Sequence, residues 1–246
     1  MIFESNYMSL LTNTLIYFFN ALYGKKTNII NKNTTMKKTM TLFAVLLISV
    51  ATLAQTNYEK AMIKNLQAMK DAKSVSDWQD IANGFGRIGS MEKEEWLPSY
   101  HQAFSYIIMS TIETEAAKKD KFLDSAQESI DAMKNMETDE SEVMALQGFL
   151  HTMRMLVDPT TRGQQYSGLS MAALAKAKKL NPENPRAAYM LAQMAYGQAQ
   201  FFGSSTDDAC NAMKEAITKF DNFKLASDIA PNWGRKQAEG ILKNCQ

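Results

Sequence analysis

Residues 170–182 read SMAALAKAKKLNP, and the order of residue sizes in this stretch decides the fold. A small residue at position 170 is followed by a large apolar one, Leu174, then by a second small one, Ala177, and by Pro182. The spacings of four and three place these side chains on one face of a helix, which the proline ends. Small residues let two helices cross closely while the larger residue fills the space beside them. The stretch therefore predicts the second helix of a packed helical hairpin.

The same order of sizes recurs along the chain, which indicates an internal repeat. It returns at residues 209–220 and, more loosely, at residues 126–136. The pattern resembles the tetratricopeptide repeat, whose second helix has the same small and large positions and a proline at its exit. The alternative is an ordinary bundle of alanine-rich helices.

The interval between equivalent positions supports the repeat. Phe104, Gly148 and Ala192 follow one another at intervals of 44 residues. We therefore expect Gly148 and Ala192 to lie at close helix crossings. The interval exceeds the ~34 residues of a standard tetratricopeptide repeat, and the excess is expected in loops at 158–165 and 202–206. The repeat is therefore better described as tetratricopeptide-like.

Residues 55–246 are rich in good helix formers, and no stretch alternates with a period of two as a strand would. The predicted fold is all-α: a right-handed stack of antiparallel helical hairpins, that is, a tetratricopeptide-like α-solenoid, closed by a C-terminal capping helix. The expected helices are 58–72, 76–90, 95–117, 120–136, 141–157, 164–180, 185–201, 206–222 and 232–244.

An export signal precedes this domain. Residues 36–55 read MKKTMTLFAVLLISVATLAQ, with two lysines, a short apolar stretch and small residues before Gln55. This is the pattern of a signal peptide cleaved after Ala54, and it predicts a periplasmic or secreted protein. The residue directly after the cleavage site is Gln55 and not a cysteine, so no lipid anchor is expected. Residues 1–35 are interpreted as a mis-assigned start; the alternative is a membrane segment at residues 10–23.

Removal of residues 1–54 changes the charge of the chain. The whole sequence has 27 basic and 26 acidic residues. Residues 1–54 contain five lysines and one glutamate, so 22 basic and 25 acidic residues remain, a net charge of −3. This balance gives no reason to expect nucleic acid or an anionic membrane as a partner. Residues 55–246 are long enough for one self-sufficient domain.

Four phrases in this domain resemble a family of small exported tetratricopeptide-like proteins of Bacteroidetes. They are residues 81–88 (IANGFGRI), 95–100 (EWLPSY), 184–187 (NPRA) and 230–234 (APNWG). The resemblance covers nearly the whole exported part. It implies a helical-repeat fold and no assigned chemistry.

Catalysis is not indicated. His101 and His151, the two histidines, both fall within expected helices and have no metal-ligating partner at i+4. The acidic cluster at residues 92–95 is typical of a solvated helix start. Gly84, Gly86 and Gly89 mimic a nucleotide fingerprint without the strand that it requires. We predict no enzyme activity, cofactor or metal, and a hydrolase is the least favoured alternative.

The two cysteines, Cys210 and Cys245, are expected to form a disulfide. If helices 206–222 and 232–244 are an antiparallel hairpin turning near residue 227, the two cysteines lie side by side at its open end. Export removes the chain from the reducing cytosol. Two separate buried thiols are the alternative.

The predicted function is non-catalytic: a cell-envelope scaffold or adaptor that binds a protein or peptide through the concave face of the solenoid. A glycan-binding accessory protein is the alternative, and its groove would expose Tyr189 and Tyr196. Arg186 is a third candidate for the interaction surface, although we expect its guanidinium first to bond carbonyls or acids of a neighbouring turn.

Overall fold

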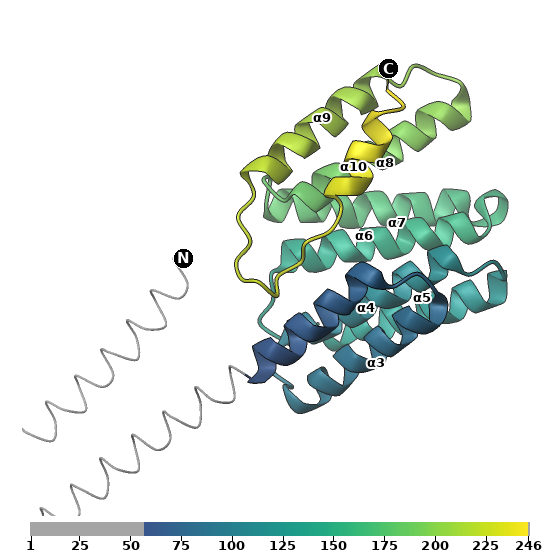
Figure 1. Cartoon of the computed structure of the whole chain (residues 1–246). Coiled ribbons are helices and arrows are strands. Elements are labelled where there is room, and N and C mark those ends of the chain that lie inside the picture. Colours follow the sequence, from purple (N-terminus) through teal and green to yellow (C-terminus); the bar gives the residue numbers. More distant parts are fainter. Residues whose placement is uncertain (1–56, 246) are drawn as a thin grey trace, which may run out of the picture. The chain divides into compact units, whose positions relative to one another are not determined.

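The computed structural model describes residues 57–245, and within this range every regular element is a helix (Figure 1). The predicted extension at 1–35, the signal peptide at 36–54 and its cleavage site between Ala54 and Gln55 lie outside the described residues. A first helix spans 57–71. The helices after it are α3 (Val75–Met91), α4 (Trp96–Ile112), α5 (Ala116–Ala132), α6 (Glu140–Val157), α7 (Pro159–Leu180), α8 (Pro185–Phe202), α9 (Asp207–Asn222) and α10 (Arg235–Leu242).

One expected loop is wrong: residues 158–165 are almost entirely helical. A single residue, Asp158, separates α6 from α7 and lies at the end of one helix and the start of the other. Its carboxylate accepts hydrogen bonds from the backbone N–H and the hydroxyl of Thr161. Pro159 then occupies the first turn of α7, where its missing N–H costs no helical hydrogen bond. The extra length of the repeat thus lies in a 22-residue helix rather than in a loop.

Polar side chains begin or separate several of the other helices. Ser74, rather than Ser76, begins α3 in a reciprocal capping box with Asp77. The carboxylate of Glu113 accepts hydrogen bonds from the next two backbone N–H groups, and this turn separates α4 from α5. The expected boundary near 117–120 was therefore a few residues late.

The helices form a stack of antiparallel hairpins. Each helix from α3 to α10 packs against the next one in sequence. In addition, α4 packs against α6 and α6 packs against α8, and we call these three the inner helices (Figure 1). The outer helices α5, α7 and α9 make no comparable set of contacts with one another within the described chain. This is the arrangement of an α-solenoid, in which the first helix of each pair lines one face.

The 44-residue interval is confirmed at the helix crossings. Ala192 is buried on α8, and Gly148 is buried on α6 directly against Leu174 of α7. A Cβ atom at position 148 would lie 2.5 Å from Cγ of Leu174. The small residue is therefore required by the close approach of α6 and α7, as the repeat predicted.

Candidate functional site

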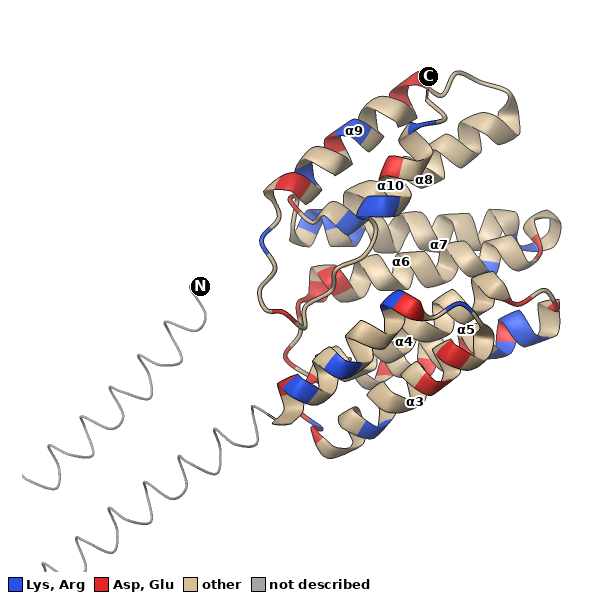
Figure 2. Cartoon of the chain, in the orientation of Figure 1, with Lys and Arg blue, Asp and Glu red and all other residues tan. Residues whose placement is uncertain are grey.

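The inner helices carry few charged residues. Helix α4 contains no Asp, Glu, Lys or Arg, and α8 contains Arg186 alone, which is buried. Helix α6 has charged residues near its two ends and none between residues 143 and 153. By contrast, the outer helices α5 and α9 carry both acids and bases along their length, as Figure 2 shows, whereas α7 has no charged residue at 163–175. An uncharged row of inner helices favours contact with apolar chain or an apolar ligand over contact with ions.

The chain's own C-terminal segment lies against these inner helices. After α9, residues 223–234 run back to α4 and then return to α10 (Figure 1). The backbone carbonyl of Ile229 lies 2.8 Å from Nε2 of His101, which must donate because a carbonyl can only accept. The indole Nε1 of Trp233 donates to the Tyr100 hydroxyl at 2.9 Å. These two hydrogen bonds join residues 128 and 133 positions apart in the sequence.

Three aromatic rings meet where this segment contacts the inner helices. The ring of Trp233 stacks on Phe149 of α6 with 5.4 Å between centroids and 27° between planes. Its centroid also lies 5.4 Å from that of Phe104 of α4. Phe104 is buried, whereas Phe149 and Trp233 are half-buried. We call these three residues the aromatic platform, in which the rings pack against one another.

Two of the three residues predicted to form an interaction surface are buried, so that prediction is wrong for them. Arg186 donates from Nε and Nη2 to the two carboxylate oxygens of Glu142 at 2.5 and 2.6 Å. Its guanidinium carbon also lies 4.6 Å from the ring centre of Phe223, in the C-terminal segment. Both members of the ion pair are almost fully buried. Glu142 and Arg186 are 44 residues apart, so the pair joins the same position of two successive hairpins.

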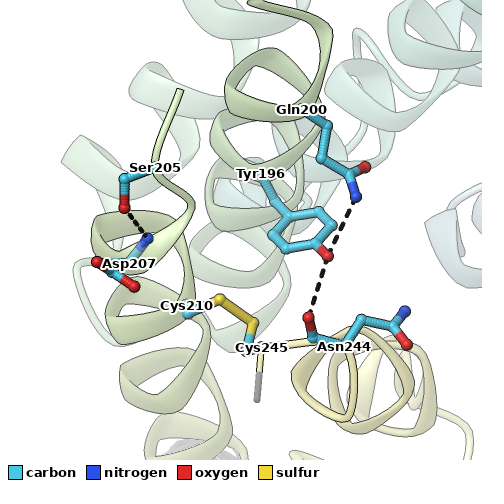
Figure 3. The surroundings of a disulfide bond; sticks show 7 residues. All are labelled: Tyr196, Gln200, Ser205, Asp207, Cys210, Asn244 and Cys245. Carbon is cyan, nitrogen blue, oxygen red and sulfur yellow. Dashed lines mark hydrogen bonds between the residues drawn. A yellow bond between two sulfur atoms is a disulfide. The ribbon is translucent and has the colours of Figure 1, made fainter. Parts of the chain in front are cut away.

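Tyr189 is the second of these buried residues, because Gly234 and its neighbours cover the side of α8 on which it lies. A Cβ atom at position 234 would lie 3.3 Å from a ring carbon of Tyr189. Burial raises the pKa of Tyr189 to about 12. Tyr196 is half-buried, and its hydroxyl lies 3.5 Å from the backbone carbonyl of Asn244 and accepts from Gln200 (Figure 3). The two tyrosines therefore do not form the exposed pair that a glycan-binding groove would need.

The C-terminus is tied to α9 by a disulfide. Cys210 lies in the first turn of α9 and bonds to Cys245, just beyond α10, with 5.8 Å between the Cα atoms (Figure 3). The described residues hold no free cysteine. The disulfide thus holds the end of α10 beside the start of α9, at the open end of the α9–α10 hairpin.

The titratable side chains are engaged in packing and ion pairs. Burial lowers the pKa of His101 to about 4, so its ring is neutral near pH 7. His151 is half-buried between Gln147, whose amide lies 3.1 Å from its Nε2, and the ring of Tyr166. Burial, and secondarily Arg154, lower the pKa of His151. Among residues 57–245, no three His, Cys, Asp or Glu side chains are grouped to hold a metal ion.

Sequence reasoning missed the aromatic platform. From the sequence, Phe104 is predicted only as a repeat position, and Trp233 lies in a phrase that carries the family resemblance and predicts no contact. The available signal was the absence of charged residues from α4 and from the middle of α6, which can be read directly from the sequence. The partner of Trp233 could not be read there, since residues 223–234 have no period that would assign them to a face.

Few known proteins match the chain. No protein-family model matches the chain, and no curated protein matches it. Among solved structures, the chain is similar to the HusA haemophore from Porphyromonas gingivalis, with a TM-score of 0.68 and 28% sequence identity. The match covers 77% of this chain and 92% of the haemophore. The likeness is to a helical protein of a Bacteroidetes bacterium and to a binding protein rather than an enzyme. Membership of a tetratricopeptide-like family stays a prediction.

None of the helices within residues 57–245 combines the length and the apolar character needed to cross a bilayer.

Proposed function

We propose that this protein is an exported, non-catalytic carrier that binds a flat, apolar ligand of the tetrapyrrole class on its aromatic platform. The observation that supports this proposal most strongly is the stack of two half-buried rings, Trp233 of the C-terminal segment and Phe149 of the uncharged middle of α6. Planar ring systems favour offset stacking on such side chains, and small-molecule sites are lined mainly by apolar and aromatic residues.

The similarity to a haemophore directs the choice of ligand. The haemophore is 28% identical to our chain over most of both proteins, and its name states that it carries haem. In our chain, His101 is buried and bonded to Ile229, and His151 lies on α6 between Gln147 and Tyr166, so neither faces the platform as an obvious iron ligand. We therefore propose recognition through the porphyrin ring system rather than through the metal.

Export belongs to the proposal as well. The signal peptide at 36–54, cleavage between Ala54 and Gln55, and one domain over 55–246 would place the carrier in the periplasm or outside the cell. A carrier in that compartment meets haem or porphyrin before the cell imports it. Intact-mass measurement of the native protein tests this part, since it should begin at Gln55; a species that retains residues 1–35 would contradict it.

Titration with haemin and with metal-free protoporphyrin tests the ligand class. We expect both to bind the purified, oxidised protein, with quenching of tryptophan fluorescence. Phe149→Leu and Trp233→Leu should each weaken binding roughly twofold to tenfold, from ~0.5–1.5 kcal/mol per aromatic contact. Phe201→Leu is the matched control, because Phe201 is an exposed phenylalanine at the end of α8 and outside the platform. If neither haemin nor protoporphyrin binds, the proposal is refuted.

A protein partner is the second candidate function, and a specific surface feature favours it. Phe201 and Phe202 are 78% and 70% exposed at the end of α8, with their ring centroids 5.1 Å apart. Exposed aromatic pairs are enriched at protein interfaces. Crosslinking in intact cells followed by mass spectrometry tests this function: a specific partner should be captured by the wild type and lost from a Phe201→Ser/Phe202→Ser variant. Capture that is equal for both would rule out this surface.

A further inference from the structure

We infer that the Cys210–Cys245 disulfide positions Trp233 and thereby sets the affinity of the aromatic platform for its ligand. This inference rests on the proposed function for the ligand class, but its structural part does not. Neither cysteine belongs to the platform, so the two cysteines are positioning residues that act through α10.

Helix α10 connects the disulfide to the platform. The helix has eight residues, Arg235–Leu242. It begins two residues after Trp233 and ends three residues before Cys245. A helix this short is not stable by itself, so its position depends on what holds its two ends.

The end of α10 next to Trp233 is held by non-covalent contacts. Gly234 has a φ of 102°, and a Cβ atom there would lie 2.9 Å from the ring of Phe220 and 3.3 Å from that of Tyr189. Ala238, one turn later, is fully buried in the cluster formed with α8 and α9. The hydrogen bond from Trp233 to Tyr100 completes this anchor.

The opposite end of α10 is held by the disulfide, its one covalent connection to α9. Beyond Leu242 the chain has no further described helix, and Asn244 contributes one long contact, 3.5 Å from its carbonyl to the Tyr196 hydroxyl (Figure 3). Cys245 is joined covalently to Cys210, which is buried in the first turn of α9. Ile241 and Leu242, in the last turn of α10, pack half-buried against the hydrophobic cluster around α8 and α9. Without the disulfide, this non-covalent packing is what holds the last turn.

The consequence for the platform follows from the length of α10. When the end at Cys245 is released, the short helix frays, and Ala238 and Gly234 lose the constraint that presses them against α8 and α9. Trp233 then leaves the Phe149 stack for part of the time. A site whose competent state is populated for only a fraction of the time binds with an affinity reduced by that fraction. The disulfide therefore raises ligand affinity in addition to stabilising the fold.

The test compares the wild type with Cys210→Ser/Cys245→Ser, a double variant that leaves no odd thiol. Well below the melting temperature of both proteins, we expect the dissociation constant for protoporphyrin to rise at least roughly tenfold, equivalent to ~1.4 kcal/mol. Reduction of the wild type with dithiothreitol should reproduce the change. The control is Leu123→Ala, which removes a buried side chain from the outer helix α5 and lowers stability without touching α10. It should retain wild-type affinity.

A measurement without ligand separates this inference from the proposed function. The indole N–H of Trp233, assigned by its loss in Trp233→Phe, should exchange with solvent slowly in the wild type and in Leu123→Ala because it is hydrogen-bonded to Tyr100. It should exchange much faster in the double variant. Unchanged indole exchange together with unchanged affinity would overturn the inference. Fast exchange in a protein whose wild type binds no porphyrin would retain the positioning role and refute only the proposed ligand.

Discussion

The first hairpins and the last one are held together by different means. The larger hydrophobic cluster runs from the helix at 57–71 to α6 and is rich in large side chains such as Trp78, Phe85 and Tyr100. The smaller cluster, around α8, α9 and α10, has seven buried side chains, of which three are alanine. Burial of large apolar side chains supplies most of a domain's stability. The C-terminal region has less of it, and it carries instead a disulfide, a buried ion pair and a segment that reaches back to α4.

The comparison teaches where each part should be vulnerable. The first hairpins should resist the loss of single polar groups, since their packing is extensive. The C-terminal region should depend on a few specific ties, and removal of any one should be costly. The predictions below test that difference, beginning with the largest expected effect.

Replacement of Arg186 by methionine should give the largest loss. It leaves the Glu142 carboxylate buried without its partner, and such a change typically costs ~3–5 kcal/mol. Urea unfolding at pH 7 measures it. The double variant Glu142→Leu/Arg186→Met is the control and should recover most of the loss, because an apolar pair of similar volume needs no desolvation of charge. If the single variant unfolds like the wild type, the ion pair does not tie α6 to α8.

Loss of the disulfide should rank next. The bond closes a loop with a sequence separation of 35, for which the chain-entropy model gives ~3–4 kcal/mol. Cys210→Ser/Cys245→Ser should unfold at correspondingly lower urea concentrations. Titration of thiols in the denatured, unreduced native protein should find none; two reactive thiols would show that the bond is absent and would remove this tie from the comparison.

Acid should weaken the contact between α4 and the C-terminal segment. His101 has a pKa of about 4 in the folded protein, against 6.5 for the free side chain. As the pH falls, the unfolded chain therefore takes up a proton at this histidine before the folded protein does. The contribution of His101 to the free energy of unfolding is complete above pH 6.5 and is lost as the pH falls to 4. The full difference is about 3 kcal/mol. His101→Gln, whose amide can still donate to Ile229, should be less stable at neutral pH but should lose this component of the pH dependence; an unchanged profile would contradict the assignment.

The smallest effect is expected at the crossing of α6 and α7. Gly148→Ala places a methyl group 2.5 Å from Cγ of Leu174, and overpacking of this kind costs ~1–3 kcal/mol. Gly168→Ala is the matched control: the residue is exposed within α7, and a Cβ atom there meets nothing within 4 Å. It should stabilise by ~0.5–1 kcal/mol through helix propensity. Equal effects at the two glycines would contradict the close crossing.

Much of the fold could be predicted because its signals are local. The helices come from residue composition and caps, and Asn184 followed by Pro185 begins α8 as expected. The 44-residue interval predicts Gly148 and Ala192 at helix crossings, and both are buried. The candidate site was predicted poorly. Tyr189 was assigned to an exposed groove and Arg186 to a candidate interaction surface, whereas both are buried. The bond expected between Arg186 and an acidic side chain is present, with Glu142.

By itself, the sequence determined that this chain is a stack of helical hairpins, because size patterns with helical spacing report on neighbours within one or two helices. Tertiary structure alone decided what covers the inner helices. Ile229 bonds to His101, and Trp233 bonds to Tyr100, each across more than 120 residues. Residues 223–234 have no periodic pattern from which these contacts could be predicted. An irregular segment has no face of its own, so its place depends on shape and hydrogen-bonding groups that only the folded stack brings together.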